Sequence, residues 1–253
     1  MTNETSPLFR MVNLRKKSFI KESHPQYYIA DRGMNKYLKE LPDFQGRDIK
    51  GHILNRVNKN EKVSILDVGC GAGAFLVDAF KLNPQHVQVS GITAFDYRNM
   101  LYPNEQKIAL KHIEYRIGDA QKIKEIFEGK RFDFIASVWT LGYVGDPLNV
   151  LRKCYSLLNT NGVLFVDKIP NRISKEDARK LQDYWTKRGI ESEFRSFADF
   201  SLAVKKNDRI KKLPLPFGYS TEDNYYKFNG EYKLPEADEE NIISSVNSPQ
   251  KTL

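Results

Sequence analysis

Short apolar runs alternate with longer amphipathic stretches along residues 63–205. This alternation is typical of repeated strand–helix units arranged around a parallel sheet. We interpret each apolar run as a strand, because a strand of a parallel sheet is buried on both faces and is therefore apolar throughout. Strands are predicted at residues 63–68, 86–92, 112–117, 132–138 and 163–166, and alternation predicts two more, at 192–196 and 200–204, for seven in total.

The stretches outside these strands place apolar residues at helical spacing. Ile49, Ile53 and Val57 fall on one face of a lead-in helix. Pro147 stands where a helix begins, and Ser174 followed by Asp177 has the pattern of a helix N-cap with a nearby carboxylate. We expect helices at residues 47–58, 74–80, 105–111, 122–127, 147–158 (with Leu158 on its inner face) and 175–188.

The order of these elements predicts the fold class. The last two strands are joined by only residues 197–199, which makes them antiparallel neighbours because a parallel pair needs a long crossover. An Asn161-Gly162 turn is expected just before the fifth strand. The chain is thus predicted to be an α/β protein with a seven-stranded, mostly parallel sheet, one antiparallel strand and helices on both faces.

The chain divides into a core at residues 47–206 and two extensions, residues 1–46 and 207–253. Residues 25–29 and 34–41 of the first extension are expected to fold over the sheet as a lid. In the second, residues 225–228 are interpreted as one arm of a small hairpin that turns at Asn229-Gly230. The end, from about Glu236, is acidic and then rich in Ser and Asn, which predicts disorder.

Composition excludes several classes of protein. The apolar runs are far shorter than the roughly 20 residues of a membrane-spanning helix, and the polar start lacks the pattern of a signal peptide. A cytoplasmic protein without a membrane partner is expected. Cys70 and Cys154 form no Cys-x-x-Cys pair and lie near no histidine cluster, so neither a disulfide nor a metal site is expected.

The net charge of +8 bears on partners rather than on fold. A lysine-rich solvated surface is favoured over a nucleic-acid groove, since no aromatic-rich basic motif accompanies the charge. A nucleic-acid partner stays open as an alternative.

Asp67, Gly69, Gly71 and Gly73 form an Asp-x-Gly-x-Gly-x-Gly turn between the first strand and its helix. Such a turn lets a ligand approach the backbone, and it exposes the unpaired N–H groups and positive dipole end of the helix. The dinucleotide fingerprint would need a glycine where Ala74 stands, and no Gly-Lys-Ser or Gly-Lys-Thr of a phosphate loop follows.

Four segments together resemble the motifs of class I S-adenosylmethionine-dependent methyltransferases. They are ILDVGCGAG at 65–73, IGDA at 117–120, FDFIAS at 132–137 and LLNTNGVL at 157–164. The resemblance extends over residues 63–205. It implies a Rossmann-like sheet, S-adenosylmethionine as cofactor and methyl transfer as the activity.

The resemblance also implies which residues bind this cofactor. Asp67 and Gly69 would border its methionine end, while Gly71 and Gly73 would admit its close approach. Asp119 would lie near the adenine amino group, and the alternative for this residue is a helix N-cap, a role that is compatible with the first. The implied set is completed by Cys70 in the turn, the backbone amide of Ala120, and Ser137 at the end of the fourth strand.

One position departs from the family pattern. The second strand of the family usually ends in Asp or Glu, which holds both ribose hydroxyls, but Thr93 stands there. Thr93 can make a single, weaker contact. Asp96, three residues later, is the other candidate, and its alternative role is a cap or a surface ion pair.

The segment after the fourth strand lies at the carboxyl edge, where ligands of open α/β sheets bind. Trp139 and Tyr143 are candidates for walls around the methyl acceptor, together with Tyr28 of the expected lid. The alternative for Trp139 and Tyr143 is packing of a loop under that lid.

The same segment excludes several acceptors. It lacks the Asn-Pro-Pro-Tyr pattern of amino-group methylation, and Cys154 is expected in a helix rather than near the site, so no nucleophile for pyrimidine carbon is present. Ser137 stands where a Lys-Asp-Lys-Glu tetrad needs an acid. A small-molecule acceptor is favoured, and a protein or RNA acceptor recognised in an unfamiliar way stays open. The alternatives are a non-catalytic binding protein on the same fold that recruits a protein or nucleic acid, and a nicotinamide-dependent reductase, which the missing Tyr-x-x-x-Lys pair disfavours.

Overall fold

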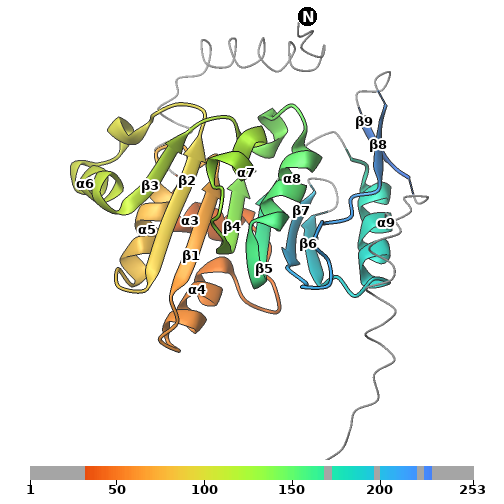
Figure 1. The fold of residues 1–253 in the computed structure, drawn as a ribbon, viewed down its shortest axis with the longest axis horizontal. Coiled ribbons are helices and arrows are strands. Elements are labelled where there is room, and N and C mark those ends of the chain that lie inside the picture. Colours follow the sequence, from red (N-terminus) through yellow and green to blue (C-terminus); the bar gives the residue numbers. More distant parts are fainter. Residues whose placement is uncertain (1–31, 168–172, 197–199, 221–224, 230–253) are drawn as a thin grey trace, which may run out of the picture.

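The centre of the molecule is a seven-stranded sheet (Figure 1), seen in a computed structural model that describes residues 32–167, 173–196, 200–220 and 225–229. Its strands are β1 Val63–Val68, β2 Val87–Thr93, β3 Ile113–Ile117, β4 Phe132–Val138, β5 Leu158–Asp167, β6 Ser192–Ser196 and β7 Ser201–Lys205. They lie side by side in the order β3-β2-β1-β4-β5-β7-β6.

The sheet has the predicted strand directions. Strands β1 to β5 pair in parallel, and β7 runs antiparallel to both of its neighbours, β5 and β6. The chain order reverses between β1 and β4, since β2 and β3 lie on one side of β1 and β4 and β5 lie on the other. Open α/β sheets bind ligands at such a reversal, outside the carboxyl ends of the strands. The predicted fold class is confirmed.

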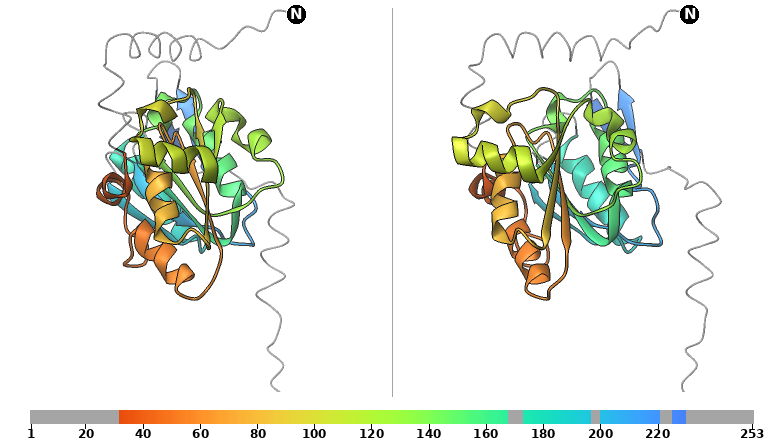
Figure 2. Two further views of the ribbon diagram at one scale, coloured as in Figure 1. Left: turned by 90° about the vertical axis from the view of Figure 1, so that its left-hand side faces the viewer. Right: turned by 60° about the vertical axis from the view of Figure 1, so that its left-hand side comes forward.

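Helices cover both faces of this sheet (Figure 2). One face packs against α3 Met34–Glu40, α4 Ile49–Val57, α5 Ala74–Leu82 and α6 Pro103–His112. The other packs against α7 Ile123–Ile126, α8 Pro147–Ser156 and α9 Lys175–Thr186. The short helices η1 Arg98–Met100, η2 Ala120–Lys122 and η3 Leu141–Tyr143 lie between strands and helices along the chain.

Side chains at the helix starts explain why the helices begin where they do. Ser174 accepts the backbone N–H of Asp177 at 2.9 Å, which confirms the predicted N-cap. Asp146 caps α8 in the same way, and Pro147 takes the first helical position, where no N–H is needed.

The region before and within β5 differs from the prediction. Leu158 begins the strand instead of ending the inner face of α8. The expected Asn161-Gly162 turn lies inside the strand, where Asn161 has a φ of +61° and the pairing with β4 shifts register. Asn tolerates this left-handed conformation, so the dipeptide makes an irregularity here rather than a strand boundary.

The packed body extends beyond residues 47–206 at both ends. Tyr37, Leu41 and Phe44 are buried, and α3 packs against α5 as part of the core. At the other end, Leu213 and Leu215 are buried, and Trp185 Nε1 donates to the Pro214 carbonyl at 2.7 Å.

The strand expected at residues 225–228 is present. Strand β9, Tyr225–Phe228, pairs with β8, Phe217–Ser220, which precedes it in the chain. The Asn229 N–H donates to the Pro216 carbonyl at 2.7 Å, and Gly230 of the expected turn lies outside the described residues. The expected lid segment at residues 25–29 and the end expected to be disordered lie outside the described residues.

Candidate functional site

The glycine turn follows β1 at the carboxyl edge where the strand order reverses. Gly69, Gly71 and Gly73 have φ values of +85°, +55° and +91°, a left-handed conformation that residues with a Cβ rarely adopt. A Cβ at Gly69 would lie 1.8 Å from Thr140 Oγ1. The turn therefore packs directly against the segment that follows β4.

Helix α5 begins immediately after this turn, with Gly73 as its N-cap. In the described part of the chain no side chain caps this end. The first backbone N–H groups and the positive end of the helix dipole are therefore directed at the turn, as a site for an anionic or polar ligand requires.

Asp67 is the buried acid of the site. It has no exposed surface, and Tyr37 of α3 donates its hydroxyl to Asp67 Oδ2 at 2.7 Å. Among the described residues no donor reaches Asp67 Oδ1. Burial raises the pKa of Asp67 to about 7, although the hydrogen bond from Tyr37 and the charge of Arg32 oppose the rise.

The register of the sheet explains why Asp67 can accept a partner from α3. Its neighbours in the sheet are Gly91 on β2 and Ala136 on β4. Both are small, so no bulky side chain lies beside the carboxylate. Tyr37 occupies the space above it and stacks on Phe75 of α5, with ring centroids 4.0 Å apart.

Two cations near α3 lie over the ring of Trp139. Lys36 Nζ is 4.8 Å and Arg32 Cζ is 5.9 Å from the ring centroid. Trp139 follows β4 directly and has a φ of +58°, which is uncommon for a bulky residue. Trp139 packs against the apolar cluster that includes α3, and its role as a wall around the acceptor stays a prediction.

The two ribose candidates differ in their surroundings. Thr93, the last residue of β2, is buried. Asp96 is exposed and holds Arg98, accepting from its Nε at 3.0 Å and its Nη2 at 2.6 Å. The hydrogen bonds from Arg98 lower the pKa of Asp96, so it is ionised at neutral pH. The surface ion pair weighed for Asp96 is present.

Asp119 has the capping role that was its alternative. Its Oδ1 accepts the Gln121 backbone N–H at 2.9 Å, and this contact begins η2 at Ala120. Asp119 and Ala120 are partly exposed and follow the carboxyl end of β3. A cap leaves the other carboxylate oxygen for a weaker contact, to Gln121 Nε2 at 3.4 Å.

Ser137 and Cys70 are buried in the framework of the site. Ser137 donates to the Val68 carbonyl at 3.1 Å and so joins β4 to β1 just below the turn. Cys70 packs where Gly91 has no side chain, since a Cβ there would lie 2.7 Å from Cys70 Sγ. Burial raises the pKa of the Cys70 thiol, which is therefore not a nucleophile.

Of the remaining acceptor candidates, Tyr143 lies in η3 with 46% of its surface exposed, and Tyr28 falls outside the described residues. Sequence reasoning missed Arg32, Tyr37 and Tyr115 as residues of this region. Tyr37 stood in a segment expected to fold over the sheet, but no local pattern indicates that it pairs with Asp67.

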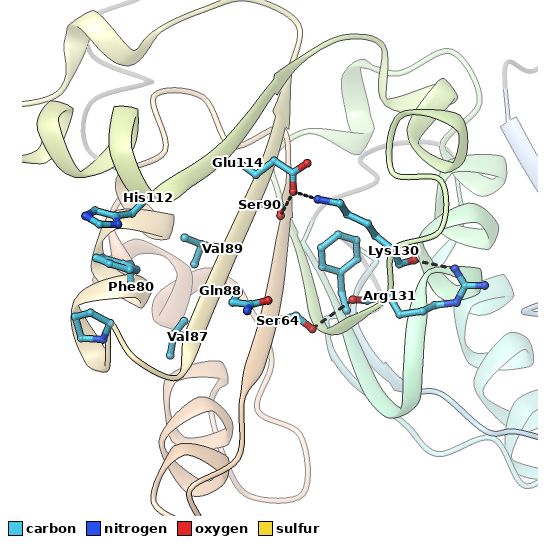
Figure 3. A pocket seen from close by; sticks show the side chains of 12 residues that line it. Ser64, Phe80, Val87, Gln88, Val89, Ser90, His112, Glu114, Lys130 and Arg131 are labelled. Atoms are coloured by element: carbon cyan, nitrogen blue, oxygen red, sulfur yellow. Dashed lines mark hydrogen bonds and ion pairs between the residues drawn. The ribbon is translucent and has the colours of Figure 1, made fainter.

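A pocket of about 530 Å³ lies along the amino-terminal half of β1, β2 and β3, away from the glycine turn (Figure 3). Glu114, in its wall, accepts from Ser90 at 3.0 Å and pairs with Lys130. Phe80 and His112 stack on its apolar side, with ring centroids 4.7 Å apart. Glu114 and Lys130 thus neutralise each other, and the pocket is separate from the candidate site.

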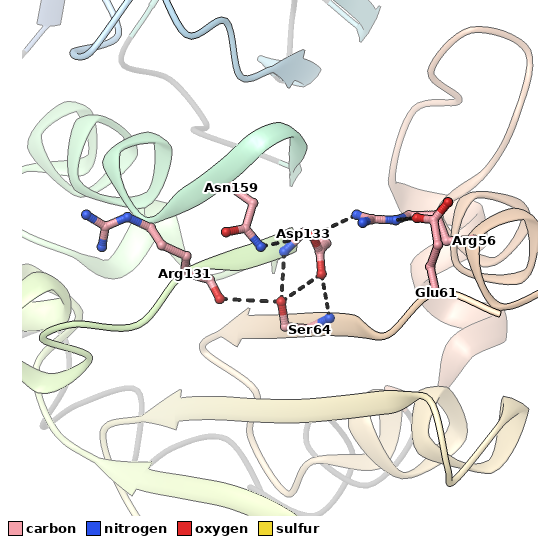
Figure 4. Close-up of polar contacts among 6 residues, drawn as sticks. All are labelled: Arg56, Glu61, Ser64, Arg131, Asp133 and Asn159. Atoms are coloured by element: carbon pink, nitrogen blue, oxygen red, sulfur yellow. Dashed lines mark hydrogen bonds and ion pairs between the residues drawn. The ribbon is translucent and has the colours of Figure 1, made fainter. Parts of the chain in front are cut away.

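Asp133 forms a second polar centre at the amino end of β4 (Figure 4). It accepts from the Ser64 backbone N–H at 2.8 Å and from Asn159 Nδ2 at 2.9 Å, and it pairs with Arg56 Nη1 at 2.7 Å. Burial opposes ionisation, but these donors outweigh it and lower the pKa of Asp133. The cluster is fully paired and holds strands together at the edge opposite the turn.

Within the ranges that the structure covers, no group of three or more His, Cys, Asp or Glu side chains is placed to hold a metal ion. None of the described helices is long and apolar enough to cross a membrane.

A family model described as a methyltransferase domain matches residues 59–226, more than half of the chain. The chain belongs to this methyltransferase family. The resemblance to class I S-adenosylmethionine-dependent methyltransferases is thereby confirmed, and the motifs that carry it fall inside the matched residues of the methyltransferase domain.

Curated relatives of this methyltransferase domain match part of it. A ubiquinone biosynthesis O-methyltransferase of Histophilus somni is 29% identical over 125 residues, covering 49% of this chain and 52% of that protein. The mitochondrial ubiquinone biosynthesis O-methyltransferase of Saccharomyces cerevisiae is 26% identical, covering 66% and 56%. The chain spans about half the length of these two relatives.

A tRNA U34 carboxymethyltransferase of Nautilia profundicola is 30% identical over 124 residues, covering 48% of this chain and 37% of that protein. Among solved structures, the CurJ carbon methyltransferase is similar with a TM-score of 0.47 and 13% identity, covering 63% of this chain and 53% of that chain.

Proposed function

We propose that this chain is an S-adenosylmethionine-dependent methyltransferase that acts on a small molecule. The observation that carries the proposal is Asp67, a buried carboxylate with one oxygen lacking a described donor, next to a turn of three left-handed glycines. A buried carboxylate oxygen is costly unless a donor reaches it, and the α-ammonium of a bound amino acid is such a donor.

The residues of the site fit both charges of that amino-acid group. Asp67 would accept from the ammonium, and Arg32, whose positive charge reaches Asp67, would hold the carboxylate. Because Asp67 has no exposed surface, a side chain that covers it would have to shift before a ligand reaches Oδ1. The glycine turn, Thr93 or Asp96, and the segment at Asp119 and Ala120 would hold the remainder of the cofactor.

When bound, S-adenosylmethionine supplies a methyl group already activated on a sulfonium, so alignment of donor and acceptor can provide most of the catalysis. The residues of this chain would then serve to bind, orient and exclude water. Trp139, with the Lys36 ammonium over its ring, is proposed as one wall of the acceptor site. Tyr143 is exposed and is proposed to contact the acceptor on the other side.

The names of the curated relatives support a small acceptor that is methylated on oxygen. A hydroxyl acceptor must lose a proton, so this reaction requires a general base. The cytoplasm is the proposed location of this reaction.

Calorimetric titration with S-adenosylmethionine and S-adenosylhomocysteine tests the cofactor. Saturable heat with either ligand is expected, and absence of heat with both would overturn the enzyme proposal. Transfer of a labelled methyl group to phenolic acceptors, compared with amine and tRNA acceptors, tests the substrate class. Label that enters only tRNA would overturn the small-molecule part.

The second candidate is a non-catalytic binding protein on the same fold. It is favoured by one observation: the second strand ends in Thr93, and the nearby acid, Asp96, is occupied by Arg98. Binding of S-adenosylhomocysteine without any methyl transfer, across all three acceptor classes, would favour this candidate.

A further inference from the structure

Tyr115 of β3 reaches across the sheet to the glycine turn. Its hydroxyl donates to the Gly71 carbonyl at 2.5 Å. Burial raises the pKa of Tyr115 above its ordinary value, so the hydroxyl keeps its proton and can donate. The turn is thus held by a side chain from two strands away, since β2 lies between β1 and β3 (Figure 1).

Gly91 lies between Tyr115 and Asp67 in the row across the sheet, because it is the register partner of both. A Cβ at Gly91 would lie within 3.0 Å of the side chains of Leu76 and Cys70. A residue other than glycine would therefore displace Cys70, which belongs to the turn that Tyr115 holds.

The same tyrosine also holds the segment that follows β2. The Tyr97 backbone N–H donates to the Tyr115 hydroxyl at 3.2 Å. Arg98 stacks on the Tyr115 ring, with its Cζ 4.7 Å from the centroid, while its guanidinium binds Asp96. One side chain therefore connects the glycine turn with the segment that carries Asp96.

We propose that Tyr115 is a positioning residue for the cofactor, which it serves by fixing the glycine turn and residues 95–98 in one arrangement. This inference rests on the proposed function, because these two segments are the ones assigned to the cofactor's methionine and ribose parts. Tyr115 itself need not touch the cofactor. It holds the two segments in place before the cofactor binds, so that less conformational entropy is lost on binding.

The test uses the full chain and its affinity for S-adenosylhomocysteine, measured by calorimetry well below the unfolding temperature. Tyr115→Phe keeps the ring and removes the hydroxyl's contacts with Gly71, Tyr97 and Phe95, and we expect Kd to rise about tenfold. Arg98→Met keeps the hydroxyl and removes the stacked charge, and we expect a smaller rise of about threefold.

Matched controls separate positioning from general damage. Tyr102→Phe makes the same chemical change at a tyrosine that is 77% exposed, and Arg116→Met changes an exposed arginine of the same strand. Both are expected to keep the wild-type Kd. A lower melting temperature in Tyr115→Phe with unchanged Kd would overturn the inference while leaving the proposed function intact. Absence of binding by the wild-type protein would overturn both.

Discussion

The Tyr37 hydroxyl donates to Asp67 Oδ2 at 2.7 Å and ties α3 to the strand that enters the glycine turn. Tyr37 is fully buried, and the same ring stacks on Phe75 of α5. The contact therefore joins three elements at one point, and it makes α3 part of the site rather than a separate arm.

Replacing Tyr37 by Phe isolates this hydrogen bond, because the stacked ring is kept. We expect the free energy of unfolding to fall by about 1–3 kcal/mol, the cost of leaving a buried acceptor without its donor. Urea denaturation at pH 8 measures the change. Tyr102→Phe is the control at an exposed position, and equal stability of the two variants would contradict the importance of the contact.

Asp67 predicts opposite pH dependences for stability and for cofactor binding. Its pKa is about 7 in the folded chain and near 3.8 when unfolded, so between these values only the folded state keeps the proton. Its contribution to stability is complete below about pH 4 and is lost as pH rises to about 7. Cofactor affinity should instead rise over pH 6–8, as the carboxylate ionises.

Asp67→Asn separates these two effects. We expect the variant to be more stable than the wild type at pH 8, because no charge is buried, and to bind S-adenosylhomocysteine more weakly and without the rise in affinity. Calorimetry and denaturation at pH 6, 7 and 8 measure both quantities. An unchanged pH profile of binding in Asp67→Asn would show that another group titrates.

Gly69 and Gly129 both have left-handed backbones, but their surroundings differ. Comparing alanine variants at the two positions therefore separates the cost of backbone strain from the cost of a steric clash. Gly129→Ala has open space around its Cβ and should cost only the backbone penalty, about 1–2 kcal/mol. Gly69→Ala carries the same penalty and in addition places its Cβ against Thr140, for about 1–3 kcal/mol more. Thr140→Gly should recover that second part. Thermal denaturation measures the stability of the three single variants and of the Gly69→Ala, Thr140→Gly double variant. Equal losses of stability at the two glycines would contradict close packing of the turn against Thr140.

Asp96 and Thr93 make competing predictions for the ribose. We expect Asp96→Ala to weaken cofactor binding more than Thr93→Ala, since two carboxylate oxygens can hold both hydroxyls and one hydroxyl cannot. Arg98→Met is the control, because Asp96 also acts on Arg98. If Asp96→Ala and Arg98→Met raise Kd equally, Asp96 acts only through Arg98. The reverse order of the first two variants would assign the ribose to Thr93.

Sequence patterns predicted several strands of the sheet to the residue. The strands at 63–68 and 132–138 are mostly apolar, whereas the strand at 192–196 is only partly buried and was recognised from its alternation. The strand at 225–228 was also recognised, yet its partner was not. Alternation identifies a strand, but which segment pairs with it depends on where the chain goes in space.

The site likewise combines a feature that neighbouring residues determine with contacts between residues far apart in the sequence. The glycine turn follows from its own residues, since left-handed backbone and close approach require glycine there. The contacts of Tyr37 with Asp67 and of Tyr115 with Gly71 join residues that are 30 and 44 positions apart. The register of the sheet places Asp67, Gly91 and Tyr115 in one row, and no local sequence pattern reveals that row.

The polar cluster around Asp133 is expected to stabilise the fold without taking part in cofactor binding. Its carboxylate is almost fully buried and joins Ser64, Asn159 and Arg56 at the amino edge of the sheet. Asp133→Asn removes the charge that pairs with Arg56, and we expect a loss of stability of about 2 kcal/mol or more.

The effect of Asp133→Asn should depend on pH, because the pKa of Asp133 is lowered in the folded chain. The contribution of Asp133 to stability is present above about pH 4 and is lost as pH falls below that value. The difference in stability between variant and wild type should therefore close in acid. Affinity for S-adenosylhomocysteine at pH 7.5 should not change, because the glycine turn lies at the other end of the strands. A weaker affinity in this variant, at a temperature where it remains folded, would show that the two edges are coupled and would extend the site beyond the carboxyl ends of the sheet.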